Sequence, residues 1–198
     1  HYRNFVTAFT NRGIVFFQNV GNPAGSPLQR VGQISMQLGV DNVGFATDSL
    51  VEMGGTVYFP GVDASGVRGI YRLSGTNAEK VSIQALDQLL LKYGSGSGTG
   101  FQMFGASLYG RPWLVMNLEN DGFEFALFFD PDTKDTWWFV PSNLTERIRY
   151  LAGNALISSD AKNLLLLGDN NTDGKYYILD PLGTVWQDDG TNTTVTIQ

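Results

Sequence analysis

"GFQMFGASLYGRPWLVMNLENDGFEFALFFDPDTKDTWWFV", residues 100–140, alternates apolar, aromatic-rich segments of strand length with short polar turns. Asn120-Asp121-Gly122 lies between two apolar segments, as a tight hairpin turn requires. Asp130-Pro131 follows the aromatic run, and proline fixes φ and cannot donate to a strand ladder. A unit of about 40 residues built in this way has the length of a four-stranded propeller blade.

Three further stretches repeat this pattern of strand, turn, aromatic-rich strand, turn and return strand. They cover residues 12–36, 54–82 and 152–187. The last of them shares a finer feature with the opening stretch, because "FFDPDTKDTWW" (128–138) and "YILDPLGTVW" (177–186) both end a strand at Asp-Pro and place a Trp a few residues later. We interpret these two as equivalent hairpins.

Composition supports the same class. The chain has 198 residues with 24 Gly, 7 Pro, 13% aromatic and only 16% charged residues, which favours short strands and many turns. We predict an all-β fold, a β-propeller of four-stranded blades with one short helical insertion, over a single domain at residues 1–198. We also expect this domain to be a fragment of a longer protein.

The one expected helix is "SIQALDQLLLKYG", residues 82–94. Its apolar residues follow helical spacing and Gly94 can end it. They are Ile83, Leu86, Leu89 and Leu90. We expect a packing insertion between blades. The Gly-rich segment that follows, residues 94–100, lacks the Lys-Ser or Lys-Thr of a phosphate-binding loop and is interpreted as a plain loop.

Charge and residue types argue against several classes of function. The formal net charge is −6, and the 13 Lys and Arg are scattered singly, so direct sequence-specific nucleic-acid binding is not expected. No apolar run has the roughly 20 residues of a membrane helix. Cys is absent and His1 is the single histidine, which leaves little for nucleophilic catalysis.

Two enzyme functions, a glycosidase and a propeller sialidase, have weaker support in the sequence than a role without catalysis. Glu119, Asp121 and Glu124 could serve a glycosidase, but they flank a turn sequence. Arginines that could bind a substrate carboxylate, as in propeller sialidases, are few. They are Arg111, Arg147 and Arg149. We predict no catalytic residues, no cofactor and no enzyme activity.

"LGDNNTDGKYYILDP", residues 167–181, has the acidic spacing of a calcium loop, with Asp169, Asn171 and Asp173 alternating and Asp180 at the twelfth position. An EF-hand needs flanking helices, whereas apolar strand-like segments lie on both sides here. We interpret the segment as a hairpin and predict no metal site, with calcium binding by the Asp169–Asp180 hairpin left open.

Two stretches carry a resemblance to a known family: "VFFQNVGNPAGSPLQRV" (15–31) and "DSLVEMGGTVYFPGVDASGVRGIYRLSGTNAEKVSIQALDQLL" (48–90). Their Gly-Asn and Gly-Ser-Pro turn, the "SLVEMGGTVYF" strand, "GVRGIYRLSG" and "VSIQALDQLL" resemble the packaged-DNA stabilisation proteins of short-tailed bacteriophages. The resemblance covers about half of the chain. Gln84 stands where many relatives have His.

The resemblance implies a structural role in the virion tail or neck. Such proteins form a homo-oligomeric ring below the portal and its adaptor, help to retain packaged DNA, and offer a platform for the needle or fibres. The expected partners are therefore portal-adaptor and tail-needle or fibre proteins, with no membrane and with synthesis in the bacterial host cytoplasm. The exposed turns at residues 22–27 and 130–137 are our first interface candidates, although either could be an ordinary solvated turn.

Two rival functions stay open. A carbohydrate-binding or carbohydrate-cleaving propeller of a tail fibre would expose Trp and Tyr around a pocket with carboxylates, whereas Trp137, Trp138 and Trp186 filling the blades would oppose it. A calcium-stabilised extracellular adhesion propeller would lose stability on chelation.

Overall fold

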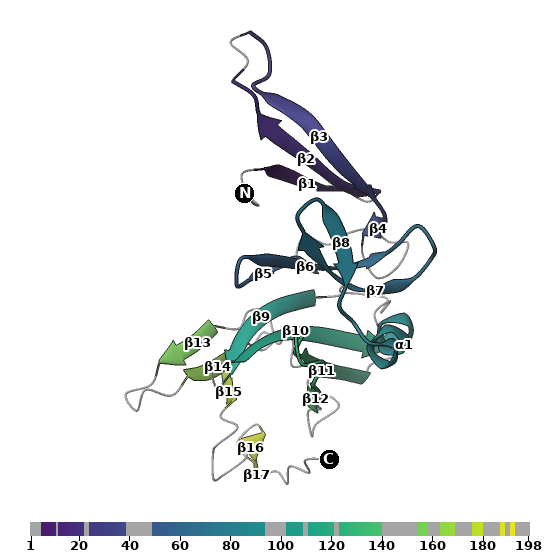
Figure 1. The fold of residues 1–198 in the computed structure, drawn as a ribbon. Coiled ribbons are helices and arrows are strands. Elements are labelled where there is room, and N and C mark those ends of the chain that lie inside the picture. The colour runs from purple at the N-terminus through teal and green to yellow at the C-terminus, as the bar shows by residue number, and fades with distance from the viewer. Residues whose placement is uncertain are drawn as a thin grey trace.

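The computed structural model shows a mostly β chain with one short helix, which confirms the predicted class (Figure 1). The described residues are 5–10, 12–21, 24–38, 49–93, 102–108, 111–120, 123–139, 154–157, 163–168, 176–179, 187–188 and 191–192. Every strand pair among them is antiparallel.

The N-terminal sheet contains β1 (Val6–Thr10), β2 (Gly13–Asn19) and β3 (Leu28–Ser35) in that spatial order. Its register changes between Phe16, which pairs with Gly32, and Phe17, which pairs with Arg30. Val31 is therefore the extra residue of a β-bulge on the edge strand.

The second sheet has the order β4-β6-β7-β8. Its strands are β4 (Gln37–Leu38), β5 (Val51–Met53), β6 (Thr56–Val62), β7 (Arg68–Ser74) and β8 (Asn77–Lys80). Both β4 and β5 pair with β6, at opposite ends of that strand. Together they fill one edge position of the sheet.

The third sheet is a four-stranded meander, as the opening stretch predicts. It contains β9 (Gln102–Leu108), β10 (Arg111–Asn120), β11 (Phe123–Phe129) and β12 (Thr136–Phe139) in the order β12-β11-β10-β9. The smaller sheets contain β13 (Asn154–Ile157), β14 (Asn163–Gly168) and β15 (Tyr176–Leu179), and β16 (Gln187–Asp188) with β17 (Thr191–Asn192). The four stretches identified in the sequence thus correspond to four sheets.

The second sheet is buried on both faces. Because side chains alternate along a strand, Phe59 and Tyr71 face the N-terminal sheet, where they join Ile14 and Phe16 in one buried cluster. Tyr58 and Ile70 lie on the other face, in a second cluster built largely from the third sheet. In that cluster Leu114 and Phe129 pair across β10 and β11. The three sheets therefore stack as successive layers (Figure 1).

The predicted helix is confirmed as α1 (Gln84–Tyr93). Leu86 and Leu90 are fully buried in the cluster between the second and third sheets, while Leu91 is exposed. The helix therefore packs between two sheets, as expected of an insertion between blades. Within the described part of the chain the sheets remain separate and form no closed ring.

Candidate interaction surfaces

The turn between β11 and β12, residues 130–135, is the Asp-Pro turn, and its buried Asp130 organises it. The N–H groups of Asp132 and Thr133 donate to Asp130 Oδ1 at 2.9 and 3.2 Å. The Asp130 N–H donates to the Asp135 carbonyl, and the Lys134 N–H donates to the Asp130 carbonyl, each at 2.9 Å. The strand ends at Phe129, directly before Asp-Pro, as the sequence predicted. The same holds for β15, which ends before Asp180-Pro181.

Arg111 anchors this turn from the start of β10. Its Nη2 lies 2.7 Å from Asp130 Oδ2, 2.7 Å from Thr133 Oγ1 and 2.8 Å from Asp135 Oδ2. Its guanidinium also lies over the Trp113 ring, 5.1 Å from the centroid. Of the arginines considered for a substrate carboxylate, Arg111 binds carboxylates of its own chain, while Arg147 and Arg149 lie outside the described residues.

This arrangement stabilises the charged forms of all three groups. Burial alone would raise the pKa of Asp130, but the N–H groups of Asp132 and Thr133 and the Arg111 guanidinium outweigh it and lower the pKa. Hydrogen bonds from Arg111 and Thr133 lower the pKa of Asp135. Hydrogen bonds to Asp135 and Asp130 raise the pKa of Arg111. The turn is therefore built around a charged cluster at neutral pH.

Lys134 ties the Asp-Pro turn to the second sheet. Its backbone has φ 69°, a left-handed conformation that is uncommon for a non-glycine residue. From this position Lys134 Nζ donates to the Val81 carbonyl at 2.8 Å and to the Pro131 carbonyl at 2.5 Å. The Val81 N–H in turn donates to the Ile70 carbonyl of β7 at 2.9 Å. One side chain thus bridges two sheets.

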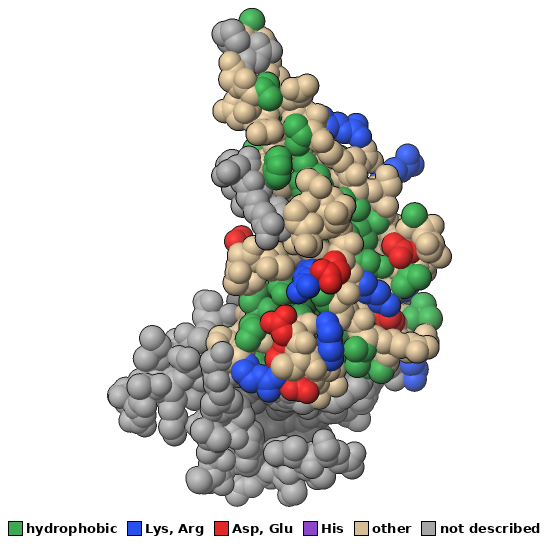
Figure 2. All heavy atoms as spheres, in the orientation of Figure 1, with side chains coloured by type: hydrophobic (Ala, Val, Ile, Leu, Met, Phe, Trp, Pro, Cys, Tyr) green, Lys and Arg blue, Asp and Glu red, His purple; other side chains and the backbone are tan. Residues whose placement is uncertain are grey.

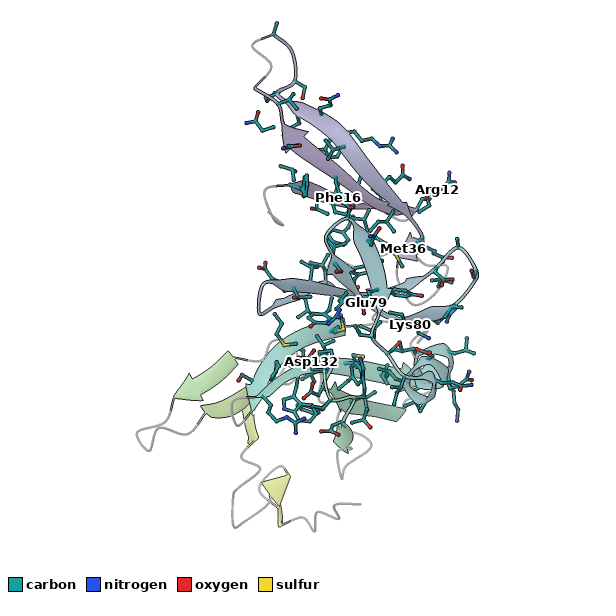
Figure 3. The ribbon with its side chains drawn as sticks, in the orientation of Figure 1. Arg12, Phe16, Met36, Glu79, Lys80 and Asp132 are labelled. Carbon is teal, nitrogen blue, oxygen red and sulfur yellow. The ribbon has the colours of Figure 1, made fainter. Side chains whose placement is uncertain are left out.

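Arg72 of β7 makes a second, weaker link across the same junction. Its Nε donates to Glu79 Oε2 at 2.9 Å, and its Nη1 lies 4.0 Å from Asp132 Oδ1. Charged side chains of both signs gather on this part of the visible face (Figure 2), and Figure 3 shows Glu79, Lys80 and Asp132 close to the boundary between the sheets. The predicted interface turn at residues 130–137 is therefore held to the second sheet, and only its outward side remains for a partner.

A hydroxyl, a carboxylate and an amine meet at the start of α1. Ser82 Oγ donates to Asp87 Oδ1 at 2.5 Å, and Lys80 Nζ pairs with Asp87 Oδ2 at 2.5 Å. The Ile70 N–H donates to Ser82 Oγ at 3.0 Å. A Cβ on Gly69 would lie 2.4 Å from Ser82 Oγ, so a larger residue there would displace the side chains of this cluster. These contacts fasten α1 to the second sheet.

The other predicted interface turn belongs to the β2–β3 hairpin. Residues 22–23 of this turn lie outside the described part. The remainder is ordered by short-range contacts, with the Val20 N–H donating to the Pro27 carbonyl at 2.9 Å and the Gly21 N–H to Asn19 Oδ1 at 2.9 Å. Unlike the Asp-Pro turn, this hairpin reaches away from the stacked sheets (Figure 1).

The remaining sequence candidates divide into confirmed hairpins and untested side chains. Asn120 pairs with Phe123, so a tight hairpin joins β10 and β11, with residues 121–122 outside the described part. Glu119 pairs with Glu124 in backbone register. Gly168 pairs with Tyr176, so strands β14 and β15, rather than helices, flank residues 169–175, and an EF-hand is excluded. Its loop residues 169–175 lie outside the described part, and calcium binding there stays open.

The described residues offer neither a metal site nor a membrane-spanning helix. No group of three or more His, Asp or Glu there is placed to hold a metal ion. No helix in the same residues is long and apolar enough to cross a membrane.

Sequence reasoning missed the bridging role of Lys134 and the cluster of Lys80, Ser82 and Asp87. A Lys at a left-handed position carries no sequence signal, because glycine or asparagine is the usual residue there. The Ser82-to-Asp87 spacing at a helix start was a usable signal, since Ser commonly precedes helices and acidic residues are favoured in the first turn.

Comparison with known proteins gives a family. A family model described as the beta-propeller of bacteriophage P22 Gp10 matches residues 1–182, which is most of the chain. No curated protein matches the sequence.

Proposed function

The chain belongs to the phage DNA-stabilisation family represented by P22 Gp10, and from this membership we propose that it closes the portal channel of a phage and retains the packaged DNA. The family is one of phage structural proteins, which makes the chain virion-associated. The family match over residues 1–182 is the observation that carries the proposal. The finer location that we propose is the tail or neck, after synthesis in the host cytoplasm.

The stack of sheets supports the proposed propeller. In a propeller each blade is a four-stranded antiparallel sheet whose two faces lie against neighbouring blades. The second sheet has this property, since separate buried clusters cover its two faces. We propose that the third sheet and its successors continue the series until it closes, with residues 1–198 forming one propeller domain.

Such a structure suits a plug that must resist the pressure of packaged DNA. Sheets buried on both faces are held by side-chain packing, while strand edges and turns remain available for several independent contacts. The net charge of −6 would disfavour adhesion of phosphates, so the genome could slide past when the channel opens. This is a structural role without sequence-specific nucleic-acid binding and without catalysis.

The proposed partners follow from this location. We propose that copies of the chain form a homo-oligomeric ring, that one face of the ring meets the portal adaptor, and that the other supports the needle or fibres. The outward side of the Asp-Pro turn is one contact candidate, because Asp132 is 68% exposed there. The β2–β3 hairpin is the other.

A retention assay on particles assembled without the protein tests the proposal. We expect capsids that package DNA but release it, measured as DNA that becomes accessible to nuclease, and rescue by adding the protein. Particles that retain DNA normally without it would contradict the proposed function.

Immunogold electron microscopy of intact virions tests the location separately, with tailless capsids as the control. Label at the tail vertex supports the proposal. Label on peripheral fibres would instead favour the carbohydrate-binding alternative. Among the aromatic residues whose side chains the structure describes, none is exposed, so these side chains give that alternative no support. The side chains of Trp137, Trp138 and Trp186 lie outside the description.

A further inference from the structure

The N-terminal sheet lies at one end of the stack of three sheets, and the second sheet covers one of its faces (Figure 1). Side chains alternate along a strand, and Ile14 and Phe16 of β2 are buried against the second sheet. Val15 and Phe17, the neighbouring residues of the same strand, therefore lie on the opposite face. We name this opposite face the outer face.

The outer face of β1 and β2 consists of apolar side chains. The backbone register places Val6 opposite Phe17 and Ala8 opposite Val15, so these four residues form one continuous patch. Val6 is 37% exposed, and the other three are partly buried. Neither of the buried clusters on the two sides of the second sheet includes them. Among the described residues, the patch is therefore outside the packed interior.

This composition is typical of a sheet that is covered on both faces. An antiparallel sheet with one face in water usually alternates apolar and polar residues, whereas β2 has four consecutive apolar residues at positions 14–17. Strand β6 has a comparable run, from Val57 to Phe59, which is buried because sheets lie on both of its faces. The outer face of the N-terminal sheet thus has the residues of a packing surface.

Strand β3 gives the apolar patch a polar border. In the backbone register Arg30 is opposite Phe17 and Gln33 is opposite Val15, and both polar residues are exposed. The Arg30 guanidinium donates a hydrogen bond to the Gln33 side chain, which places the two on the same face. An apolar centre with a polar rim is the usual anatomy of a surface that packs against another one.

We propose that the outer face of the N-terminal sheet is the closing surface of the propeller, and that a later sheet of the same chain covers it. In a propeller every sheet lies between two others, and the family model described as a beta-propeller includes the N-terminal sheet. The second sheet already has this environment, since sheets of its own chain cover both of its faces. The inference rests on the proposed propeller domain and names the surface at which that domain closes.

A second copy of the chain is a less favourable occupant than a sheet of the same chain. Each copy has a formal net charge of −6, so two copies repel each other. A sheet of the same chain is instead held near the outer face by the polypeptide itself, which gives it a high effective concentration. Apolar packing within one chain is therefore the cover that these residues favour.

Thiol labelling of the full-length protein measures whether the outer face is covered. The chain has no Cys, so Val6→Cys introduces a single thiol into the apolar patch. Val67→Cys is the matched control, because Val67 is 41% exposed and lies between β6 and β7, away from the patch. We expect native Val6→Cys to react at least about tenfold more slowly than native Val67→Cys, with equal rates in urea. Equal rates in the two native proteins would overturn the inference.

Dilution of the labelled protein distinguishes the two occupants. A cover that belongs to the same chain protects Val6→Cys equally at every protein concentration, so dilution by about a hundredfold should leave its rate unchanged. A rate that rises on dilution would identify a second copy as the cover and would overturn the inference.

Hydroxyl-radical footprinting of the wild-type protein tests the same surface without a substitution. We expect Phe17 to be protected in the native protein and Leu91, which is 53% exposed on α1, to be oxidised, each compared with the unfolded protein. If Phe17 is oxidised as readily as Leu91, the outer face is open and the inference is wrong.

The DNA-retention assay separates this inference from the proposed function. A full-length protein that restores retention, but whose Val6→Cys thiol reacts as fast as that of Val67→Cys, would reject the closing surface and leave the function standing. A protein that is protected at Val6→Cys but fails to restore retention would reject the function and leave the closing surface standing.

Discussion

Strand β6 of the second sheet and β3, an edge strand of the N-terminal sheet, differ in composition and in what covers them. Five consecutive residues of β6, from Val57 to Gly61, are buried, because neighbouring sheets lie on both faces. In β3 only Gly32 and Ile34 are partly buried. The difference teaches that an isolated sheet of this type is incomplete, and that stability comes from stacking one sheet on the next.

The largest expected effect on stability is at the contact between the second sheet and the N-terminal sheet. Phe59 is fully buried, and its ring lies 5.8 Å from that of Phe9 and 6.2 Å from that of Tyr71. Phe59→Ala should lower the free energy of unfolding by about 3–5 kcal/mol, measured by urea denaturation, because it leaves a cavity between two sheets. Val31→Ala, on the exposed edge strand, should change it by less than about 0.5 kcal/mol. Equal losses at the two positions would break the comparison.

The next effect concerns the Asp-Pro turn. Asp130→Ala removes the acceptor of two backbone N–H groups and the partner of Arg111, and should cost about 1–3 kcal/mol in unfolding free energy. Asp132→Ala is the control, because its ion pair with Arg72 spans 4.0 Å and it should change stability by less than about 0.5 kcal/mol. If Asp132→Ala were the more damaging variant, the turn would be organised by its outer contacts instead.

Two variants of Lys134 distinguish the effect of its left-handed backbone on stability from the effect of its side chain. Lys134→Met and Lys134→Gly both remove the donor to the Val81 carbonyl. Glycine adopts φ 69° without the steric cost that other residues meet, so Lys134→Gly should be more stable than Lys134→Met by roughly 1 kcal/mol. Thermal or urea unfolding measures this difference. The opposite order would mean that the left-handed backbone is not retained in solution.

The smallest effect is a change in pH dependence. The folded-state pKa of Asp135 is lowered, so its contribution to stability is present above its unfolded pKa of about 4 and is lost as pH falls toward the folded value. Asp135→Asn should therefore be less stable than wild type at neutral pH, and the difference should shrink below about pH 4. Unfolding curves at several pH values measure it, and a difference that grows with acid would contradict the assignment.

Local signals in the sequence predicted much of the fold. The Asn120–Gly122 turn, both Asp-Pro strand ends and the helix at residues 82–94 each depend on a few neighbouring residues, and the structure confirms them. The division of one edge position between β4 and β5 was missed, because it depends on which part of β6 each segment reaches. The projection of the β2–β3 hairpin beyond β1 was missed for the same reason, since β3 pairs with β2 as far as Asn19, whereas β1 pairs with it only as far as Phe17.

The most direct test of the central claim is a cryo-electron microscopy reconstruction of the tail vertex in intact virions. We predict density at the exit of the portal channel into which copies of this chain fit, with the three stacked sheets as successive blades of the propeller in each copy. Density for this chain on peripheral fibres, or copies in which these sheets do not lie side by side as blades, would contradict the account.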